Sequence, residues 1–426
     1  MLSTAGSNWS QNVDYRAARL HLPRTVEEVQ SIVAGSTSVR ALGSRHSFNT
    51  IADTAGDLIS LEQLSIPVVV DAAAMTVTAS AGMRYGELGA ELQAAGYALA
   101  NLASLPHISV AGAITTATHG SGIANGNLAT AVAGLTLVLA DGSLLSLGRG
   151  DADFAGAVVG LGSLGILVSV TLDILPTFDV AVNVFENLPW DALLASFDEI
   201  TGAAYSVSLF TDWSGAAVDQ VWLKHRVTAS APIADAATAG AFFGATPASV
   251  RRHPLPGISA EACTEQLGIP GAWIDRLPHF RLDFTPSNGA ELQTEYMVPR
   301  DNAAAAITAL RALGSKITPL LFVSEIRTMT ADDLWLSMAY GRDTVAFHFT
   351  WQLRQAEVEA LLPEIEKALA PFSVRPHWGK LATLDAAALA ALYPRHADFV
   401  ALAERLDPTR VFRNDFVDTK VFGVTA

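Results

Sequence analysis

Residues 39–49 read VRALGSRHSFN, in which the strand-like run 39–42 leads directly into a turn of small residues that carries one histidine, His46. The pattern predicts a strand over residues 39–42, and Gly43 and Ser44 predict a turn after it. Successive backbone N–H groups in such a turn form a concavity that suits an anionic phosphate. His46 could then act as a nucleophile or as a covalent attachment point beside the bound group. Taken alone, an ordinary loop histidine is the commoner outcome.

A second segment with the same character covers residues 101–122. It combines small residues, hydroxyls and two histidines, His107 and His119, with almost no charge. Small side chains let the backbone approach a large flat ligand, and Ser and Thr hydroxyls can hydrogen-bond to it. By itself the segment could also be a buried glycine-rich turn in the core. Beside the turn at residues 43–47, it predicts a second wall of one cofactor cradle.

The dinucleotide fingerprint G-x-G-x-x-G occurs literally at residues 160–165, GLGSLG. That fingerprint requires a strand before it and a helix after it, because the helix N-terminus holds the pyrophosphate. Here residues 154–159 predict a helix, and residues 166–174 alternate as a strand. The order is reversed, so we predict a helix-to-strand turn and no Rossmann phosphate site.

Local patterns predict further elements before residue 175. Residues 25–28 form a capping box ahead of the apolar stripe of a first helix. Strands are expected at 58–61, 68–71 and 75–79, and a helix at 86–95 that ends at Gly96. Asp141-Gly142, between the runs 135–140 and 144–147, predicts a two-residue hairpin turn.

Composition argues for a large, well-packed globular protein. Of 426 residues, 50% are hydrophobic and 16% charged, which predicts two or three domains and no disordered chain. A formal net charge of −15 argues against nucleic acid and anionic membrane surfaces as partners. A single cysteine, Cys263, excludes an internal disulfide and fits the reducing cytoplasm, where we expect the protein.

Neither a signal peptide nor a membrane span is expected. The first residues lack a basic region followed by an apolar one. The most apolar run, residues 155–175, is interrupted by glycines, serines and Asp173.

Two strand-like segments in the second half of the chain carry polar residues at alternate positions. Residues 324–328, SEIRT, place Glu325 and Arg327 on one face, because side chains alternate with a period of two. Residues 345–353, VAFHFTWQL, are apolar at every second position, the first and last included.

His348 and Thr350 lie between those apolar positions and therefore face the other way. If the two strands share a sheet, these side chains join Glu325 and Arg327 in a polar wall that suits a polyhydroxylated ligand. On the pattern alone, a solvated sheet face is an equal alternative.

The loop RPHWGK at residues 375–380 carries Lys380. A lysine is by default a surface residue, but beside a bound alcohol it would supply positive charge where negative charge develops. No ligand spacing such as H-E-x-x-H is present, so no metal site is predicted. The absence of a G-x-S-x-G elbow argues against a Ser-His-Asp hydrolase.

Six motifs follow one another along nearly the whole chain, from about Asn8 to Phe422: GSRHSFN (43–49), ASLPHISVAG (103–112), THGSG (118–122), SEIRT (324–328), HFTW (348–351) and RPHWGK (375–380). Together they resemble the vanillyl-alcohol-oxidase superfamily of FAD enzymes, in particular its branch of bacterial alditol oxidases, which act on xylitol and sorbitol. Arg45 departs from the pattern, since many relatives have a small residue such as glycine there. The departure bears on phosphate contacts and not on the attachment of His46.

The resemblance implies an α+β fold of two domains. A VAO/PCMH-type FAD-binding domain would cover residues 1–175, and a mixed-sheet substrate (cap) domain residues 176–370. Residues 371–426 would return to the first domain and complete the active site.

The resemblance also implies FAD that is covalently attached through the imidazole of His46 to the flavin 8α carbon. Gly165 and Ile166 would approach the adenine end by backbone contact. The further cofactor-binding residues that it implies are Ala41, Leu42, Gly43, Ser44, Arg45, Ser47, Ser104, Ser109, Gly112, Ala113, Ile114, Thr115, His119 and His377.

The implied reaction turns a terminal C1 alcohol into the aldose by hydride transfer to flavin N5, with O2 as electron acceptor and H2O2 as product. Cations near the alcohol oxygen help, because its proton leaves as the hydride departs. Arg327 and Lys380 are therefore candidate catalytic residues, with His348 to orient them or accept a proton. The candidate substrate-binding residues are Ser104, Glu325, Arg327, Thr350 and Lys380.

Two other functions stay open. An aldonolactone oxidase or dehydrogenase of the L-gulono-1,4-lactone type belongs to the same superfamily, and the polar wall alone does not separate a linear polyol from a lactone. A flavin-binding protein without catalysis is the other, against which the intact Glu325, Arg327 and Lys380 argue. We expect a monomer with a small polyol as its partner, and no nucleic acid or membrane.

Overall fold

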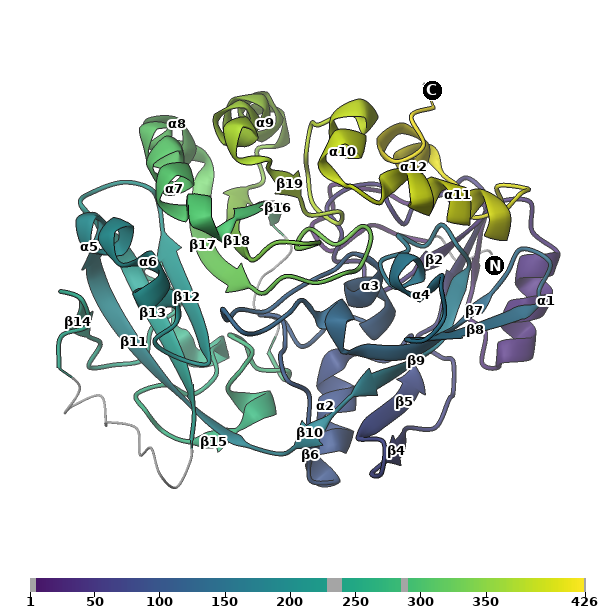
Figure 1. The fold of residues 1–426 in the computed structure, drawn as a ribbon, viewed down its shortest axis with the longest axis horizontal. Helices are drawn as coiled ribbons and strands as arrows, with labels where there is room; N and C mark the ends of the chain where they lie inside the picture. Colours follow the sequence, from purple (N-terminus) through teal and green to yellow (C-terminus); the bar gives the residue numbers. More distant parts are fainter. Residues whose placement is uncertain (1–4, 228–239, 285–289, 425–426) are drawn as a thin grey trace.

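The computed structural model describes residues 5–227, 240–284 and 290–424. It has an α+β architecture in which two groups of sheets lie side by side, each covered by helices (Figure 1). The earlier part of the chain forms one group, and residues 179–376 form a nine-stranded sheet.

The stretch that precedes the histidine turn forms the strand β2 (Val39–Leu42), as predicted. β2 pairs in parallel with β3 (Asp57–Ser60), which also pairs in parallel with β1 (Arg19–His21). This three-stranded sheet therefore fixes where the turn at Gly43 begins.

Helix α1 (Val26–Ala34) starts at Thr25, whose side chain accepts a hydrogen bond from the Glu28 N–H at 3.2 Å. Half of the predicted capping box is wrong, because the Glu28 carboxylate accepts from the N–H of Arg24, one residue before the cap, at 2.6 Å. Val29 and Val33 are buried, as the apolar stripe predicts.

A five-stranded antiparallel sheet in the order β4-β5-β9-β7-β8 and a two-stranded sheet of β6 (Tyr97–Ala98) and β10 (Leu175–Pro176) complete the first group. The predicted strands are confirmed, with bounds that differ by a residue or a few from those expected. They are β4 (Val69–Asp71), β5 (Thr76–Ser80), β7 (Val132–Val138), β8 (Leu144–Gly148) and β9 (Ile166–Asp173).

The predicted hairpin between β7 and β8 exists, but its loop is longer than the two residues predicted. Leu139 and Ser143 still pair, with the Leu139 N–H donating to the Ser143 carbonyl at 2.9 Å. Three residues therefore form the loop, and the last of them, Gly142, has φ +82°. A three-residue loop ending in a left-handed glycine is the next commonest hairpin connection after the two-residue turn.

Two further predictions near residues 86–165 are confirmed. Helix α2 (Tyr85–Ala94) ends before Gly96, which has φ +84°. The glycine-rich run at 160–165 is a turn from the short helix α4 (Phe154–Ala157) into β9, not a strand-to-helix junction.

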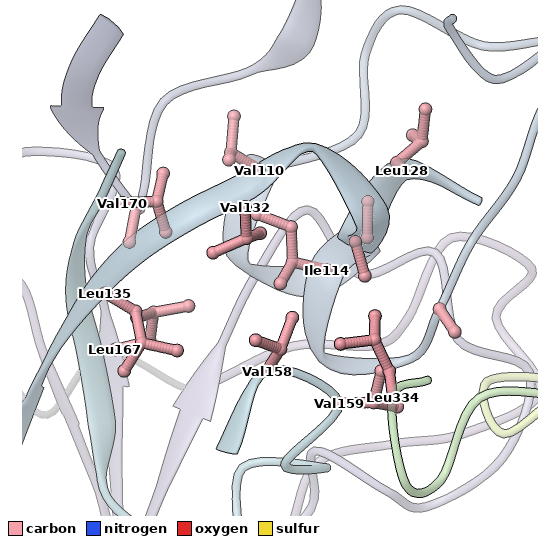
Figure 2. Close-up of a cluster of buried hydrophobic side chains, with 14 of the residues drawn as sticks. Val110, Ile114, Leu128, Val132, Leu135, Val158, Val159, Leu167, Val170 and Leu334 are labelled. Carbon is pink, nitrogen blue, oxygen red and sulfur yellow. The ribbon is translucent and has the colours of Figure 1, made fainter. Parts of the chain in front are cut away.

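The core of the first group packs around helix α3 (Val110–Thr115) and the face of the five-stranded sheet. Figure 2 shows Val110 and Ile114 directed into a cluster that includes residues of β7 and β9. A further short element here is η1 (Leu128–Ala131).

The second sheet is antiparallel throughout, in the order β14-β11-β13-β12-β17-β18-β16-β19, with β15 also paired to β11. Its strands are β11 (Asp179–Pro189), β12 (Ser206–Thr211), β13 (Ala217–Arg226), β14 (Thr246–Pro247), β15 (Gly271–Ala272), β16 (Glu291–Pro299), β17 (Leu321–Met329), β18 (Thr344–Gln352) and β19 (Arg375–Pro376).

Helices cover one face of this sheet (Figure 1) and bury the aromatic side chains of β18 beneath them. Leu353 is the exception to the predicted apolar face: it lies beyond the end of β18 and is 49% exposed. The helical elements of this region are α5 (Trp190–Ala195), α6 (Phe197–Thr201), η2 (Ala260–Ala262), η3 (Trp273–Asp275), η4 (Arg300–Asn302), α7 (Ala303–Ala312), α8 (Gly314–Ile317), η5 (Thr318–Leu320), α9 (Gln355–Leu369) and η6 (Ala370–Phe372).

The C-terminal helices α10 (Ala386–Leu392), α11 (His396–Leu406) and α12 (Asp415–Lys420) pack on the first group (Figure 1). Phe399 and Phe412 are buried in the same core as α3. Within the predicted C-terminal segment, β19 still pairs with β16 of the second sheet. The division at residues 175 and 370 stays a prediction.

Candidate active site

A cavity of about 790 Å³ lies where the two groups of sheets meet. Its walls come from the turn after β2, the segment before and along α3, the glycine-rich turn before β9, and the uncovered face of the second sheet. The structure therefore brings together the sequence segments that were predicted to form one site.

Nearly all the predicted site residues line this cavity, and two do not. Ile114 and Ile166 are completely buried in the core, because α3 and β9 turn these side chains toward the apolar cluster and away from the cavity. The predicted residues that line the cavity are Ala41, Leu42, Gly43, Ser44, Arg45, His46, Ser47, Ser104, Ser109, Gly112, Ala113, Thr115, His119, Gly165, Glu325, Arg327, His348, Thr350, His377 and Lys380.

His46 is the unusual residue of the first wall. Both ring nitrogens are buried, and neither has a hydrogen-bond partner of regular geometry among the described residues. Burial lowers the pKa of its imidazole to about 4, so the ring is neutral at neutral pH. Trp9 stacks on the ring, with 4.7 Å between ring centres and 22° between the planes. A buried polar group without a partner is costly, which indicates that another group completes this site.

The turn and the second wall touch directly. The Ser109 N–H donates to Ser44 Oγ at 3.1 Å. A Cβ built on Gly43 would lie 2.6 Å from Ser109 Oγ, so any larger residue would displace this hydroxyl. The two segments therefore form one cradle with a narrow join between its walls.

Arg45, the departure from the family pattern, has φ +64° and binds the N-terminal segment. Its guanidinium donates to the carbonyls of Ala5 and Ser7 and lies over the Tyr15 ring, 5.5 Å from the ring centre. These contacts occupy the guanidinium and fasten residues 5–15 beside the cradle.

The glycine-rich turn lines the cavity with its backbone and is held from below by Arg40. The buried guanidinium donates to the carbonyls of Leu161 and Gly162, each at 2.8 Å. It also donates to the carbonyl of Ile51 and, in the C-terminal segment, to that of Phe412 at 2.7 Å. One side chain thus ties β2, the turn and the chain's last segment together.

The polar wall forms as predicted. β17 and β18 are antiparallel neighbours in which Glu325 lies opposite His348, so their side chains share a face with Arg327 and Thr350. All four are between 5% and 8% exposed, which rules out the alternative of a solvated face.

Glu295 of β16 is the centre of the charged network on this wall, and sequence reasoning missed it. It is 1% exposed. One carboxylate oxygen accepts from Arg327 at 2.6 Å and the other from Lys380 at 2.8 Å. His119 Nε2 lies 3.1 Å from the carboxylate, and His348 Nδ1 lies 3.7 Å from it.

The network fixes the charges of its members. Burial opposes ionisation of Glu295, but the charges of Lys380 and Arg327 outweigh it and hold the pKa of this carboxyl well below its usual value. Burial lowers the pKa of the Lys380 ammonium, and Glu295 partly restores it. Burial also lowers the pKa of Arg327, but the carboxylates of Glu325 and Glu295 more than reverse this.

His348 and His377 stay neutral beside these cations. Burial, reinforced by the charge of Lys380, lowers the pKa of His348 to about 4 and that of His377 well below its usual range. His348 Nδ1 accepts from Lys380 at 2.7 Å, and its Nε2 lies 3.1 Å from Thr350 Oγ1. His348 therefore orients the ammonium of Lys380.

The sequence did contain a signal for Glu295. Glu291, Gln293 and Glu295 alternate with Leu292, Thr294 and Tyr296, a weaker form of the pattern that His348 and Thr350 show in β18. The register then pairs Glu295 with His348 and Gln293 with Thr350. The sequence alone shows this alternation, but it does not show that β16 pairs with β18.

In the part of the chain that the structure describes, no cluster of three or more His, Cys, Asp or Glu side chains could hold a metal ion. Nor does any helix in it have the length and apolar character needed to cross a membrane.

Comparison with known families gives two matches. Residues 17–148 match an FAD binding domain, and residues 289–420 match the D-arabinono-1,4-lactone oxidase family. The first match lies within the earlier group of sheets, and the second runs from β16 to the C-terminal helices α10, α11 and α12.

Full-length relatives extend the likeness. The chain is 47% identical to an alditol oxidase from a Streptomyces species, over 98% of this chain and 99% of that protein. It is 29% identical to an L-gulono-1,4-lactone dehydrogenase from Mycobacterium tuberculosis, over 97% of this chain and 98% of that one. Among solved structures, cholesterol oxidase from B. sterolicum matches with a TM-score of 0.80 at 17% identity, covering 98% of this chain and 96% of that chain. Xylooligosaccharide oxidase from Myceliophthora thermophila matches with a TM-score of 0.73 at 16% identity, covering 96% and 93%. The two structures share the fold.

Proposed function

The chain belongs to the alditol oxidase family of the vanillyl-alcohol-oxidase flavoproteins, and we propose from this that it oxidises the terminal C1 hydroxyl of a sugar alcohol such as xylitol or sorbitol to the aldose. Molecular oxygen is the proposed electron acceptor, with H2O2 as the product. The observation that carries the proposal is the buried polar wall, which faces the cradle across one cavity.

The cradle fits FAD. When bound, FAD supplies the hydride acceptor at its flavin and returns the electrons to O2. The join of Gly43 with Ser109 leaves backbone open to a phosphate, and the glycine-rich turn lines the cavity with backbone groups. The partnerless ring nitrogens of His46 support covalent attachment through this residue.

Arg327 and Lys380 bind the alcohol oxygen in this proposal. Both cations line the cavity, and together they stabilise negative charge as the hydroxyl proton leaves. Glu295 keeps Lys380 protonated and holds both cations in place.

Three more side chains can hydrogen-bond to further hydroxyls of the polyol substrate: Glu325, Thr350 and Ser104. Arg327 Nη1 lies 3.4 Å from Ser104 Oγ, so the cradle and the wall meet at this point. A substrate with several hydroxyls can satisfy these groups together, whereas an apolar alcohol would leave them unpaired at a cost.

Turnover with peroxide detection tests the proposal. Purified protein is assayed with xylitol, sorbitol and L-gulono-1,4-lactone under air, and H2O2 is measured. We expect peroxide from the polyols at a higher kcat/KM than from the lactone. No peroxide from any polyol would contradict the proposal.

A lactone substrate is the second candidate, because residues 289–420, which carry the polar wall, match the D-arabinono-1,4-lactone oxidase family. The same assay separates the two: turnover of the lactone alone would favour it. We also propose that the enzyme acts as a monomer on a small polyol.

A further inference from the structure

A buried lysine lies behind the polar wall and takes no part in the chemistry proposed above. Lys224 of β13 is 2% exposed, and its ammonium donates to the Leu277 carbonyl and to His279 Nδ1, the latter at 3.0 Å. Among the residues that the structure describes, it forms no ion pair with a carboxylate at 4.0 Å or less. A buried ammonium without a close counter-ion is costly, and burial lowers the pKa of Lys224 to about 7, although the charge of Glu325 opposes this.

His279 connects Lys224 to Glu325 of the polar wall. Its Nε2 lies 2.7 Å from Glu325 Oε1. Burial and the nearby charge of Lys224 lower the pKa of His279 to about 4, so the imidazole is neutral and has one donor and one acceptor. Because Nδ1 accepts from Lys224, Nε2 carries the hydrogen and donates to Glu325.

The ring has little freedom to turn away. Trp222 and Phe210 meet it edge-on, with ring centres 5.2 Å and 5.4 Å from its own. The backbone N–H of His279 donates to the Ser104 carbonyl at 3.1 Å, which fixes it to the cradle side of the cavity.

Glu325 is the end of this series of hydrogen bonds. One of its oxygens accepts from His279, and the other lies 3.6 Å from Arg327 Nε. Burial opposes its ionisation, but Arg327 and His279 overcome this and hold the pKa of the carboxyl below its usual value. The carboxylate lines the cavity and keeps acceptor capacity for a ligand hydroxyl.

We propose that Lys224 and His279 are positioning residues that hold Glu325 as an oriented, ionised acceptor for substrate hydroxyls, and that they thereby set the affinity for polyhydroxylated substrates. The inference rests on the proposed function, because it assumes that Glu325 binds the polyol. It assigns these two residues no contact with the reacting carbon.

Steady-state kinetics with xylitol test the inference. Lys224→Met keeps most of the length of the side chain and removes the donor, and His279→Phe removes both ring nitrogens. We expect each to raise KM about 10- to 100-fold, the range for a lost hydrogen bond to a charged group, with kcat within about threefold of the unsubstituted enzyme. His279→Gln, whose amide can accept from Lys224 and donate to Glu325, should recover most of the loss. Lys420→Met, at another partly buried lysine that donates to backbone carbonyls, is the matched control.

A double-mutant cycle separates positioning from general damage. In a Glu325→Gln background, Lys224→Met should raise KM no further, because its effect passes through Glu325. An additional increase of tenfold or more, or an unchanged KM in both single variants, would overturn the inference. If Lys224→Met fails to fold, His279→Phe and His279→Gln carry the same test, and equal KM values in that pair would overturn it. An unsubstituted enzyme that oxidises no polyol would instead contradict the proposed function.

Discussion

Single residues in this cavity differ in how they compensate for burial. The buried ring nitrogens of His46 have no hydrogen-bond partner of regular geometry among the described residues, whereas Glu295 is buried with two cations in hydrogen-bonding contact. An unpaired buried group indicates a missing partner, and a fully paired one indicates a fixed electrostatic role. His46 is accordingly the proposed attachment point, and Glu295 the residue that holds the cations.

Substitution of His46 tests the attachment. His46→Ala should leave a colourless pellet after acid precipitation, with the flavin free in the supernatant, because the covalent bond is lost. The absorbance of pellet and supernatant near 450 nm measures this. His107→Ala is the control, since His107 lies on the other segment of the cradle and its Nε2 donates to the Leu282 carbonyl at 2.9 Å. A yellow pellet from His46→Ala would contradict the attachment.

Removing the charge of Glu295 tests the network by pH. In the proposed reaction Lys380 acts as the ammonium, so kcat/KM should fall as pH rises through its pKa, which burial lowers and Glu295 raises. Glu295→Gln removes the raising charge, and the alkaline limb of the profile should move to lower pH by about one unit or more. Glu291→Gln, on the same strand and also lining the cavity, should leave the limb in place. Coincident limbs in the two variants would refute the role of Glu295.

At the scale of elements, periodicity predicted β17 and β18 and the face that each presents. In β18 the apolar residues recur at every second position, and in β17 Glu325 and Arg327 flank Ile326, so a period of two predicts a strand in both. Loop geometry was harder: Asp141-Gly142 indicated the hairpin, but whether two or three residues form its loop depends on the twist of the flanking strands. Glu295 was not predicted as a site residue, because the strand that pairs with β16 is set by the order of the sheet, which no local sequence pattern encodes.

Arg40 offers an element-scale test, since it joins β2 to the glycine-rich turn and to Phe412. Arg40→Met should lower the free energy of unfolding by about 3 kcal/mol or more, because it leaves several buried carbonyls without a donor. Chemical unfolding followed by tryptophan fluorescence measures the loss. Arg405→Met removes an exposed ion pair with Asp153 and should cost less than about 1 kcal/mol. Equal costs in the two variants would show that the carbonyl contacts contribute little.

At the scale of the whole molecule, the site lies where the first group of sheets meets the nine-stranded sheet. One carries the cradle on loops at the ends of its strands, and the other presents a polar face whose opposite face packs under helices. The sequence motifs indicated both halves of the site, because the residue types of the cradle suit a cofactor and those of the polar wall suit a polyhydroxylated substrate. Their distance and orientation depend on long-range packing, in which the last segment of the chain returns to the first core.

The central claim is that this cavity holds a flavin that a polyol reduces. The most direct measurement is the visible spectrum of the purified protein under anaerobic conditions before and after xylitol is added. We predict that the flavin absorbance near 450 nm bleaches within a few turnovers' time and returns when air is admitted. A flavin spectrum that neither xylitol nor sorbitol bleaches, or a protein without flavin absorbance, would contradict the account.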